Sequence, residues 1–231
     1  MASVIEPAPT VGAPVDGDTA RFPINRIYCV GRNYAAHARE MGKNPDRDPP
    51  FFFTKFADAY APDGSVLPYP PHTDNYHHEI ELVVAVGKAG RDIARSDAAA
   101  HVFGYATGLD MTRRDLQLDA REKGRPWDTG KNFPLSAPCT SIIPASRSGH
   151  LRTGAITLDV NGERRQEADL SELIWSVDEI IADLSRYYTL FPGDIIMTGT
   201  PAGVAAVQPG DVLLGRISGL PDLNVTIGEP A

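Results

Sequence analysis

One stretch constrains the fold more than any other, residues 76–86, with the sequence YHHEIELVVAV. From Glu79 onward it alternates and then runs apolar and β-branched, which is typical of a strand that enters a core. Because side chains alternate faces along a strand, Glu79 and Glu81 point the same way. Two carboxylates about 4 Å apart repel by roughly 4 kcal/mol at an effective dielectric near 20. Either exposure of this face to solvent, with arginine partners, or a bound hard divalent cation must offset this repulsion.

Length and composition predict an ordinary soluble globular protein. The 231 residues are 42% apolar and 23% charged, which is the balance of a chain with a normal core. The formal net charge of −8 argues against non-specific binding to nucleic acid or anionic membranes. We find neither a bilayer-spanning apolar run nor the pattern of a signal peptide. We therefore expect a cytoplasmic protein with no nucleic-acid or membrane partner.

The cysteines and the turn-forming residues refine this expectation. Cys29 and Cys139 are far apart and have no metal-like spacing, so we expect buried free thiols in a reducing cytoplasm. The 21 glycines and 20 prolines favour turns and short strands over a helix bundle. The expected fold class is mixed α/β, strand-rich and mainly antiparallel, with few peripheral helices.

The chain divides into a short N-terminal segment and one larger unit. Residues 1–20 are rich in Pro, Ala, Gly and Asp without a period, which predicts a tail or an irregular cover strand. Residues 21–231 show no helical repeat and no alternating strand–helix rhythm. We expect them to form a single domain, with 21–60 as an N-terminal subregion.

Apolar runs bounded by glycine or proline predict the strands, and capping residues predict the helices. We expect strands at 26–30, 51–55, 79–86, 102–109, 156–160, 163–166, 195–198 and 223–227, and another that starts after 209–211. We expect helices at 34–41, 98–100, 113–123 and from 177 to about 188. The proline-rich stretch 61–73 is expected to be irregular.

Three local signals support these elements. Asn161-Gly162 suits a type I′ turn between two strands and predicts a hairpin. Ser176 with Glu179 forms a capping-box pattern ahead of a helix. Asn33 is expected to cap the helix that follows it.

Asp110 is a candidate third ligand beside the two glutamates, because it follows an apolar strand. The alternative is that it caps the next helix. Glu79, Glu81 and Asp110 together would make an all-oxygen site, which suits magnesium, manganese or calcium rather than zinc. His77 and His78 directly precede the pair and could add ligands, although such histidines are more often surface or supporting residues.

His37 and Glu40 form a second constellation, three residues apart on a predicted helix. A carboxylate beside an imidazole fixes its tautomer and raises its basicity, as a general base requires. The alternative is a solvated surface pair. Lys131 lies on a Gly- and Pro-flanked loop, where a cation can reach an anionic ligand or simply remain solvated. Thr200 offers a hydroxyl in a tight loop, or is only a turn residue.

Four ordered segments resemble one family, the fumarylacetoacetate hydrolase family. They are YCVGRNYAAH at 28–37, HEIEL at 78–82, GLDMT at 108–112 and GTPAG at 199–203. The resemblance runs from about residue 26 to the C-terminus, and it predicts that 21–231 is one catalytic domain. The chain departs from the usual family pattern at Phe56, at Gly130 and at 132–134.

The resemblance implies a mixed β-roll, usually a homodimer, with Mg²⁺ or Mn²⁺ held by Glu79, Glu81 and Asp110. It implies that His37 and Glu40 are a catalytic dyad. It implies substrate contacts at Arg114, Gln117, Lys131 and Thr200.

Within the family, residues 76–82 and 49–53 most resemble the members that hydrolyse fumarylpyruvate in gentisate-type aromatic degradation. The expected reaction is hydrolysis of the carbon–carbon bond of a 2,4-diketo acid, an acylpyruvate, to an acid and pyruvate. His37 would activate the water, and Lys131 with the metal would stabilise the pyruvate enolate. Thr200 could hold the substrate carboxylate.

A dianionic substrate needs a locally positive pocket in a protein of net charge −8. We expect Arg32 or Lys55 to meet the distal carboxylate. The helix 33–41 and the charged, Pro-rich loop 43–50 are expected to form a lid within the N-terminal subregion. The alternative is a fixed helix on the roll.

Other activities use the same groups. Oxaloacetate decarboxylation needs the metal and enolate stabilisation but no attacking water. Isomerisation of a ring-cleavage product replaces bond cleavage with proton transfer. The pair His37 and Glu40 favours hydrolysis, because it can activate water. A metal-stabilised binding protein without turnover is the remaining alternative, and the intact acid, base and lysine positions argue against it.

Overall fold

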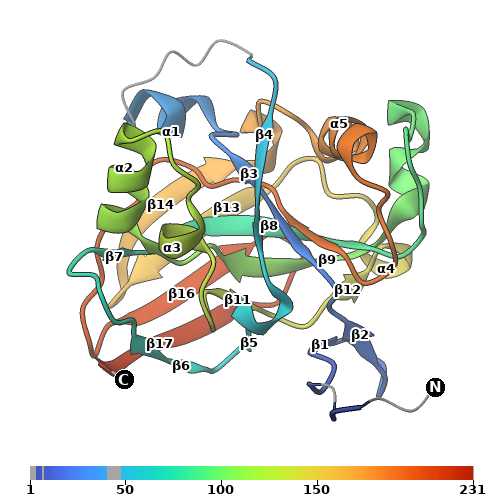
Figure 1. Ribbon diagram of the computed structural model, residues 1–231. Coiled ribbons are helices and arrows are strands. Elements are labelled where there is room, and N and C mark those ends of the chain that lie inside the picture. The colour runs from blue at the N-terminus through green and yellow to red at the C-terminus, as the bar shows by residue number, and fades with distance from the viewer. Residues whose placement is uncertain (1–3, 7, 41–47, 231) are drawn as a thin grey trace.

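Strand β8 (Ile80–Val86) lies in the middle of the larger sheet, as its apolar sequence predicts (Figure 1). The structure is a computed structural model and describes residues 4–6, 8–40 and 48–230. The larger sheet contains, in order, β4 (Phe51–Lys55), β3 (Ile27–Gly31), β15 (Ile195–Met197), β8, β9 (Val102–Leu109), β11 (Ala137–Cys139) and β5 (Tyr60–Pro62), while β12 (Ile143–Pro144) also pairs with β9.

A five-stranded sheet packs across the main core from the larger one (Figure 1). It contains, in order, β14 (Glu163–Asp169), β13 (Ala155–Val160), β16 (Val212–Ile217), β17 (Leu223–Pro230) and β6 (Val66–Tyr69). Two small ribbons pair β1 (Gly12–Pro14) with β2 (Arg21–Pro23), and β7 (Tyr76–His77) with β10 (Thr112–Arg113). Most pairings are antiparallel, so the expected strand-rich, mixed α/β fold is confirmed.

The two faces of β8 enter different cores. Leu82 and Val84 belong to the main core, which both large sheets share. Val83 and Ala85 belong to a second cluster that the β1–β2 ribbon covers. By the alternation of a strand, the side chain of Glu81 leaves β8 on the same face as Val83 and Ala85.

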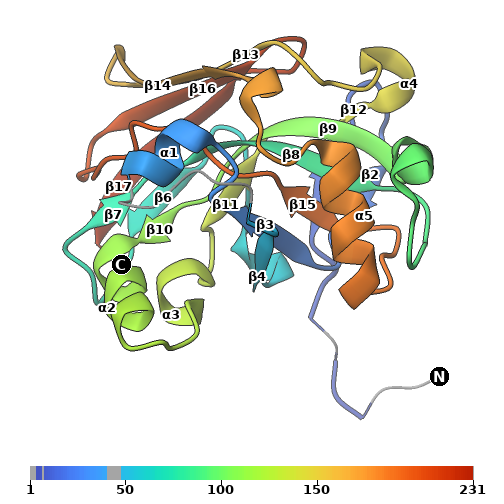
Figure 2. The same cartoon turned by 90° about the horizontal axis from the view of Figure 1, so that it is seen from above.

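The helices lie at the edges of the sheets. Figure 2 shows α1, α2 and α3 on one side of the molecule and α5 on the other. Their bounds are α1 Ala35–Glu40, α2 Arg114–Glu122, α3 Asp128–Lys131, α4 Ala145–Ser148 and α5 Val177–Tyr187, with 3-10 turns η1 Ala57–Ala59, η2 Arg95–His101 and η3 Leu170–Glu172. No described helix is long and apolar enough to cross a membrane.

Several local predictions are confirmed. Asn161 (φ 53°) and Gly162 (φ 82°) have the left-handed backbone of a type I′ turn between β13 and β14. Ser176 and Glu179 form the reciprocal capping box that starts α5. Cys29 and Cys139 are buried free thiols.

Two local predictions are wrong. Residues 61–73 are not wholly irregular, since β6 pairs in parallel with β17 within this stretch. Pro68 is tolerated because β6 is an edge strand, where a missing N–H costs no ladder bond. The Asn33 side chain bonds other segments instead, because it is buried between them: its amide donates to Trp175 O (2.9 Å) and Thr198 O (2.8 Å), and its oxygen accepts from Trp175 N (2.7 Å).

At the N-terminus, residues 12–14 form a strand within the stretch expected to be a tail or cover strand. Of the lid predicted over 33–41 and 43–50, residues 41 and 43–47 lie outside the described residues.

Candidate active site

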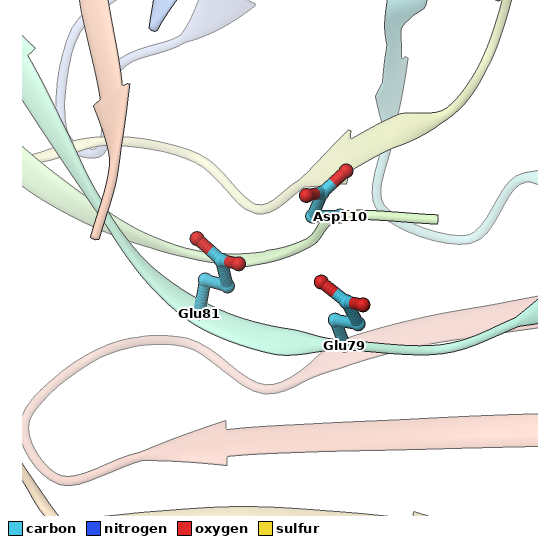
Figure 3. Close-up of side chains that lie close together, drawn as sticks. All are labelled: Glu79, Glu81 and Asp110. Atoms are coloured by element: carbon cyan, nitrogen blue, oxygen red, sulfur yellow. The ribbon is translucent and has the colours of Figure 1, made fainter. Parts of the chain in front are cut away.

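Strand pairing brings three carboxylates together at one end of β8. Glu81 pairs with Gly108 of β9, and Asp110 N–H donates to Glu79 O at 2.9 Å just beyond the ladder. Ligand oxygens of Glu79, Glu81 and Asp110 all lie within 4.8 Å of one another. Figure 3 shows the three side chains pointing into a shared space from β8 and from the end of β9. All three are buried, at 5%, 2% and 0% exposure, so the solvent-exposed alternative is wrong.

Buried cations compensate two of these carboxylates. Lys131 Nζ lies 2.8 Å from Glu79 Oε2 and 2.6 Å from Asp110 Oδ2, and it also donates to Thr112 Oγ1 at 2.8 Å. Arg114 donates to Glu79 Oε1. Burial raises the pKa of Glu79, but Lys131 and Arg114 outweigh burial and hold this pKa well below its usual range. Burial lowers the pKa of Lys131, but Asp110 and Glu79 outweigh it and raise the net pKa above its usual value.

Glu81 is compensated far less. Within the described residues its one hydrogen bond comes from the backbone N–H of Gly199, which donates to Oε2 at 2.7 Å. Burial and the nearby charges of Asp110 and Glu79 raise its pKa well above the usual range. A carboxylate in this state favours a proton or an added cation. The negative electrostatic potential of the cluster is therefore least compensated at Glu81.

The donor set fits a hard divalent ion. It consists of three carboxylates with oxygen ligands only, which is the chemistry that magnesium and manganese prefer. Asp110 Oδ1 accepts no hydrogen bond in the described residues, although Lys55 Nζ lies 2.8 Å away outside hydrogen-bonding geometry. Free lone pairs on Asp110 and Glu81 leave room for metal coordination. The acidic triad can therefore hold a divalent metal.

The helix α1 carries a histidine and a glutamate in contact. His37 Nδ1 lies 3.0 Å from Glu40 Oε2, and the imidazole is 6% exposed. Glu40 is itself anchored, because the N–H of Gly203 donates to both of its oxygens at 3.1 and 3.3 Å. Since Nδ1 faces a carboxylate, it carries the hydrogen, and Nε2 is then the nitrogen that can accept a proton. His37 is buried, whereas the Glu40 side chain is 35% exposed, so the solvated-surface alternative fits the glutamate but not the imidazole.

The loop 199–203 holds both constellations. Its first glycine bonds Glu81 and its last bonds Glu40. Gly199 (φ 98°) and Gly203 (φ 97°) have left-handed backbones that suit glycine. A Cβ at Gly203 would lie 2.0 Å from Arg165 O, and one at Gly199 would lie 2.7 Å from Asn33 Cβ. No larger residue fits at either end of this loop.

A single cavity connects the acidic cluster with His37. The predicted residues that line it are Arg32, His37, Glu79, Glu81, Asp110, Arg114, Gln117, Lys131 and Thr200. Arg114 also donates to Gln117 Oε1, so the two predicted substrate contacts are linked side by side. The structure thus brings together most of the residues that the sequence nominated.

Lys55 does not line this cavity. Its ammonium is buried behind the cluster, where it donates to Met111 O (3.2 Å), Ser136 Oγ (2.9 Å) and Lys131 O. It therefore supports Asp110 and Lys131 from the protein side.

The two neighbouring histidines are also engaged outside the ligand cluster. His77 Nδ1 accepts from Arg114 at 3.4 Å, and its Nε2 contacts Asn75 Oδ1 at 2.8 Å. Burial and the Arg114 charge lower the pKa of His77 to about 4. His78 contacts Gln166 at 3.0 Å.

Sequence reasoning missed Arg121, which lines the cavity with Arg114 and Gln117. These three residues are three and seven positions apart on α2, so they share one face of the helix. That spacing was the available signal. Arg32 lines the same cavity as Arg121, and burial together with the charge of Arg121 lowers the pKa of Arg32 below its usual value.

The aromatic lining carried no sequence signal. Phe51 and Phe53 come from β4, and Trp127 precedes α3, so only tertiary packing joins them. The rings of Phe51 and Trp127 meet edge-on, with centroids 5.4 Å apart. Gly31 makes this possible, because a Cβ there would lie 1.9 Å from the Phe51 ring.

Comparison with known proteins agrees with this arrangement. The family described as "Fumarylacetoacetate (FAA) hydrolase C-terminal" matches residues 26–228. A fumarylpyruvate hydrolase from Ralstonia is 49% identical over 190 residues, covering 81% of this chain and 98% of that protein. The human mitochondrial oxaloacetate tautomerase is 42% identical over 204 residues, covering 88% and 92% of the two chains. This chain therefore belongs to the fumarylacetoacetate hydrolase family.

The fold matches that of a solved relative over nearly its whole length. The crystal structure of fumarylpyruvate hydrolase from Pseudomonas aeruginosa, in complex with Mn²⁺ and pyruvate, superposes with a TM-score of 0.96 at 54% identity. The match covers 99% of this chain and 100% of that chain.

Proposed function

We propose that this protein is a metal-dependent hydrolase that cleaves fumarylpyruvate to fumarate and pyruvate. The observation that carries the proposal is that buried His37, which contacts Glu40 at 3.0 Å, lines the same cavity as the acidic triad. The relatives named fumarylpyruvate hydrolase, at 49% and 54% identity, support the choice of substrate. We further propose a cytoplasmic homodimer of single catalytic domains, residues 21–231, as the family resemblance implies.

In this proposal Glu79, Glu81 and Asp110 hold Mg²⁺ or Mn²⁺. The Pseudomonas relative, which contains Mn²⁺ and pyruvate, supports a divalent ion beside the keto-acid end of the substrate. The bound ion would supply positive charge that polarises the 2-keto oxygen and neutralises the developing enolate.

His37 is the general base for water. Its Nδ1–H is held by Glu40, so Nε2 takes a proton from the attacking water. The resulting hydroxide adds to the C4 carbonyl of the diketo acid. The bond between C3 and C4 then breaks, which releases fumarate and leaves its electron pair on pyruvate as an enolate. A proton delivered to C3 completes pyruvate, so one water is consumed for each bond cleaved.

Lys131 and Thr200 complete the polar lining. The raised pKa of Lys131 keeps its ammonium charged beside the triad, where it offsets the enolate charge electrostatically. Arg114 and Gln117 lie linked on the cavity wall and position the keto-acid end. Each of these groups is buried before substrate arrives, so little reorganisation is required.

Arg32 and Arg121 fit the distal carboxylate of fumarylpyruvate. Both line the cavity, and neither forms an ion pair with another described residue. The charge of Arg121 destabilises the charged form of Arg32, so an anion between them would relieve the repulsion. Arg32→Met and Arg121→Met should each raise KM for fumarylpyruvate about tenfold or more, because each variant loses a hydrogen bond to a charged group. KM for acetylpyruvate, which has no distal carboxylate, should change little.

Lys55→Met is the matched comparison for these two variants. Because Lys55 supports Asp110 behind the cavity, its loss should affect both substrates alike. If the arginine variants also affect both substrates alike, the assignment of the distal carboxylate is wrong.

Product analysis tests the proposed reaction. Purified protein with Mn²⁺ should release equal amounts of fumarate and pyruvate from fumarylpyruvate, and a chelator should abolish the release. His37→Ala should lower turnover by about 10²- to 10⁴-fold, with Mn²⁺ affinity unchanged. Conversion of oxaloacetate without cleavage of fumarylpyruvate would favour the tautomerase or decarboxylase chemistry instead, and isomerised product would favour the isomerase alternative.

A further inference from the structure

We propose that Gln166, on β14, is a positioning residue that fixes the polarity of the Thr200 hydroxyl. Gln166 holds this hydroxyl as an acceptor on the protein side, so that its hydrogen points into the cavity as a donor. The anionic end of the keto-acid substrate would be the recipient, and to that extent the inference rests on the proposed function. Gln166 itself does not line the cavity.

The orientation of the Gln166 amide is determined by its neighbours. Ile80 N–H can only donate, and it lies 3.1 Å from Gln166 Oε1. Pro201 O can only accept, and it lies 2.8 Å from Gln166 Nε2. Reversing the amide would set two donors against each other at one end and two acceptors at the other. At 1% exposure, no water could relieve such a reversal.

The Thr200 hydroxyl inherits this polarity. Gln166 Nε2 donates to Thr200 Oγ1 at 2.8 Å, and this is the only hydrogen bond of that hydroxyl within the described residues. An oxygen that accepts from an amide keeps its own hydrogen for another acceptor. Thr200 lines the cavity and is 2% exposed, so the remaining direction for its hydrogen is the cavity.

His78 holds the other side of the amide. Its Nδ1 lies 3.0 Å from Gln166 Oε1, and because that oxygen only accepts, Nδ1 carries the hydrogen. Gln166 Oε1 thus accepts from both His78 and Ile80, while Nε2 donates to both Thr200 and Pro201. His78, which directly precedes Glu79, therefore helps to orient the Gln166 amide and has a role other than metal binding.

Oxalate binding to the Mn²⁺-saturated protein tests the proposal, because oxalate mimics the planar anionic end of pyruvate enolate. In Gln166→Glu, a carboxylate oxygen faces Thr200 and takes its hydrogen away from the cavity. We expect oxalate affinity to fall about 10- to 100-fold, the loss of one hydrogen bond to a charged group. Thr200→Val should cause a similar loss. The double variant should be no weaker than either single variant by more than about twofold.

Two outcomes would overturn the proposal. One is wild-type oxalate affinity in Gln166→Glu, and the other is losses that multiply in the double variant. Mn²⁺ affinity, measured on the same variants, should stay at the wild-type value and shows that the triad is intact. Oxalate binding requires no turnover, so a wild-type protein that fails to cleave fumarylpyruvate would overturn the proposed reaction and leave this test standing.

Gln166→Met provides a second route if Gln166→Glu does not fold. Methionine has a similar shape but donates nothing to Thr200, so the hydroxyl is free to rotate. Thr200→Val should then weaken oxalate binding less in the Gln166→Met background than in wild type. An equal loss in both backgrounds would show that Gln166 does not position the hydroxyl.

Discussion

A buried carboxylate lies near each end of strand β15, and the two differ in how many hydrogen bonds they accept. Just before the strand, Asp194 is fully buried and accepts four hydrogen bonds. They come from Asn25 Nδ2 (3.0 Å), Arg26 Nε (2.9 Å), Arg26 Nη2 (2.5 Å) and Phe191 N (2.8 Å). Just after the strand, Gly199 N donates at 2.7 Å to Glu81, and this is the one hydrogen bond of that carboxylate among the residues that the structure describes.

The difference separates structural from functional carboxylates. Asp194 accepts four hydrogen bonds and is paired with one arginine, so its buried charge is fully compensated by the protein. Its role is to link the neighbouring segments. Glu81 lies among like charges with free lone pairs, and its pKa is raised by burial, Asp110 and Glu79. A fold keeps such an unsatisfied charge at a stability cost, which a bound cation would offset. A buried carboxylate is therefore not by itself a candidate metal ligand. It becomes one when the protein supplies too few hydrogen-bond donors to compensate its charge.

The largest effect on stability is expected at the saturated end. Asp194→Ala should lower the free energy of unfolding by about 2–4 kcal/mol, because four hydrogen bonds of roughly 0.5–1.5 kcal/mol each are lost. Urea unfolding of the two proteins measures this difference. Mn²⁺ affinity of the folded variant should stay near that of wild type. A loss below about 0.5 kcal/mol would remove the distinction between the two ends.

Glu81→Gln should change stability in the opposite direction. Its amide can donate to the neighbouring carboxylates, so like-charge repulsion in the metal-free protein becomes attraction. We expect the free energy of unfolding of the metal-free protein to increase by about 1 kcal/mol, which in a chain of this size raises the melting temperature by about 2–4 °C. Thermal unfolding in the presence of a chelator measures it. A lower melting temperature in the variant would mean that Glu81 is already satisfied without metal.

The pH dependence of stability sharpens the same contrast with a smaller effect. Because the folded-state pKa of Glu81 is raised above its usual 4.5, its favourable contribution is fully present below that value and is lost as pH rises through the raised pKa. The metal-free protein should therefore lose stability as pH rises above about 4.5 toward the raised pKa, and Glu81→Gln should lose less. Glu79 acts in the other direction, since its lowered pKa gives stability above 4.5 that is lost as pH falls.

Urea unfolding across this range, with and without Mn²⁺, measures the pH effect. Saturating Mn²⁺ should remove the decline in stability, because the charged form of Glu81 is the ligand. An unchanged slope in Glu81→Gln would assign the decline to other groups.

The sequence predicted strands better than it predicted the cavity. Period-two patterning and β-branched runs located β3, β4, β8 and β9 to within a residue, because each is a buried strand with clear boundaries. The stretch 61–73 failed for a physical reason. Proline content indicates a missing donor, but it does not show whether an edge position makes that donor unnecessary.

The site divides in the same way. Glu79 and Glu81 were predicted to share a face by strand alternation alone, and Arg121 could have been found from its spacing on α2. The hydrogen bond between Gln166 and Thr200 could not have been predicted from the sequence. The two residues are 34 positions apart, and only the packing of β14 against the loop 199–203 brings them together. Lys55 shows the same limit, since the sequence does not reveal which side of Asp110 its ammonium occupies.

The most direct test is a calorimetric titration of Mn²⁺ into the metal-free wild type, Glu81→Gln and Asp194→Asn. We predict that the wild type and Asp194→Asn bind one ion per chain with similar affinity. Glu81→Gln should bind about 100-fold more weakly or not at all, since losing a ligand should cost at least as much as losing an outer partner. Absence of binding in the wild type, or unchanged affinity in Glu81→Gln, would contradict the account of the acidic triad.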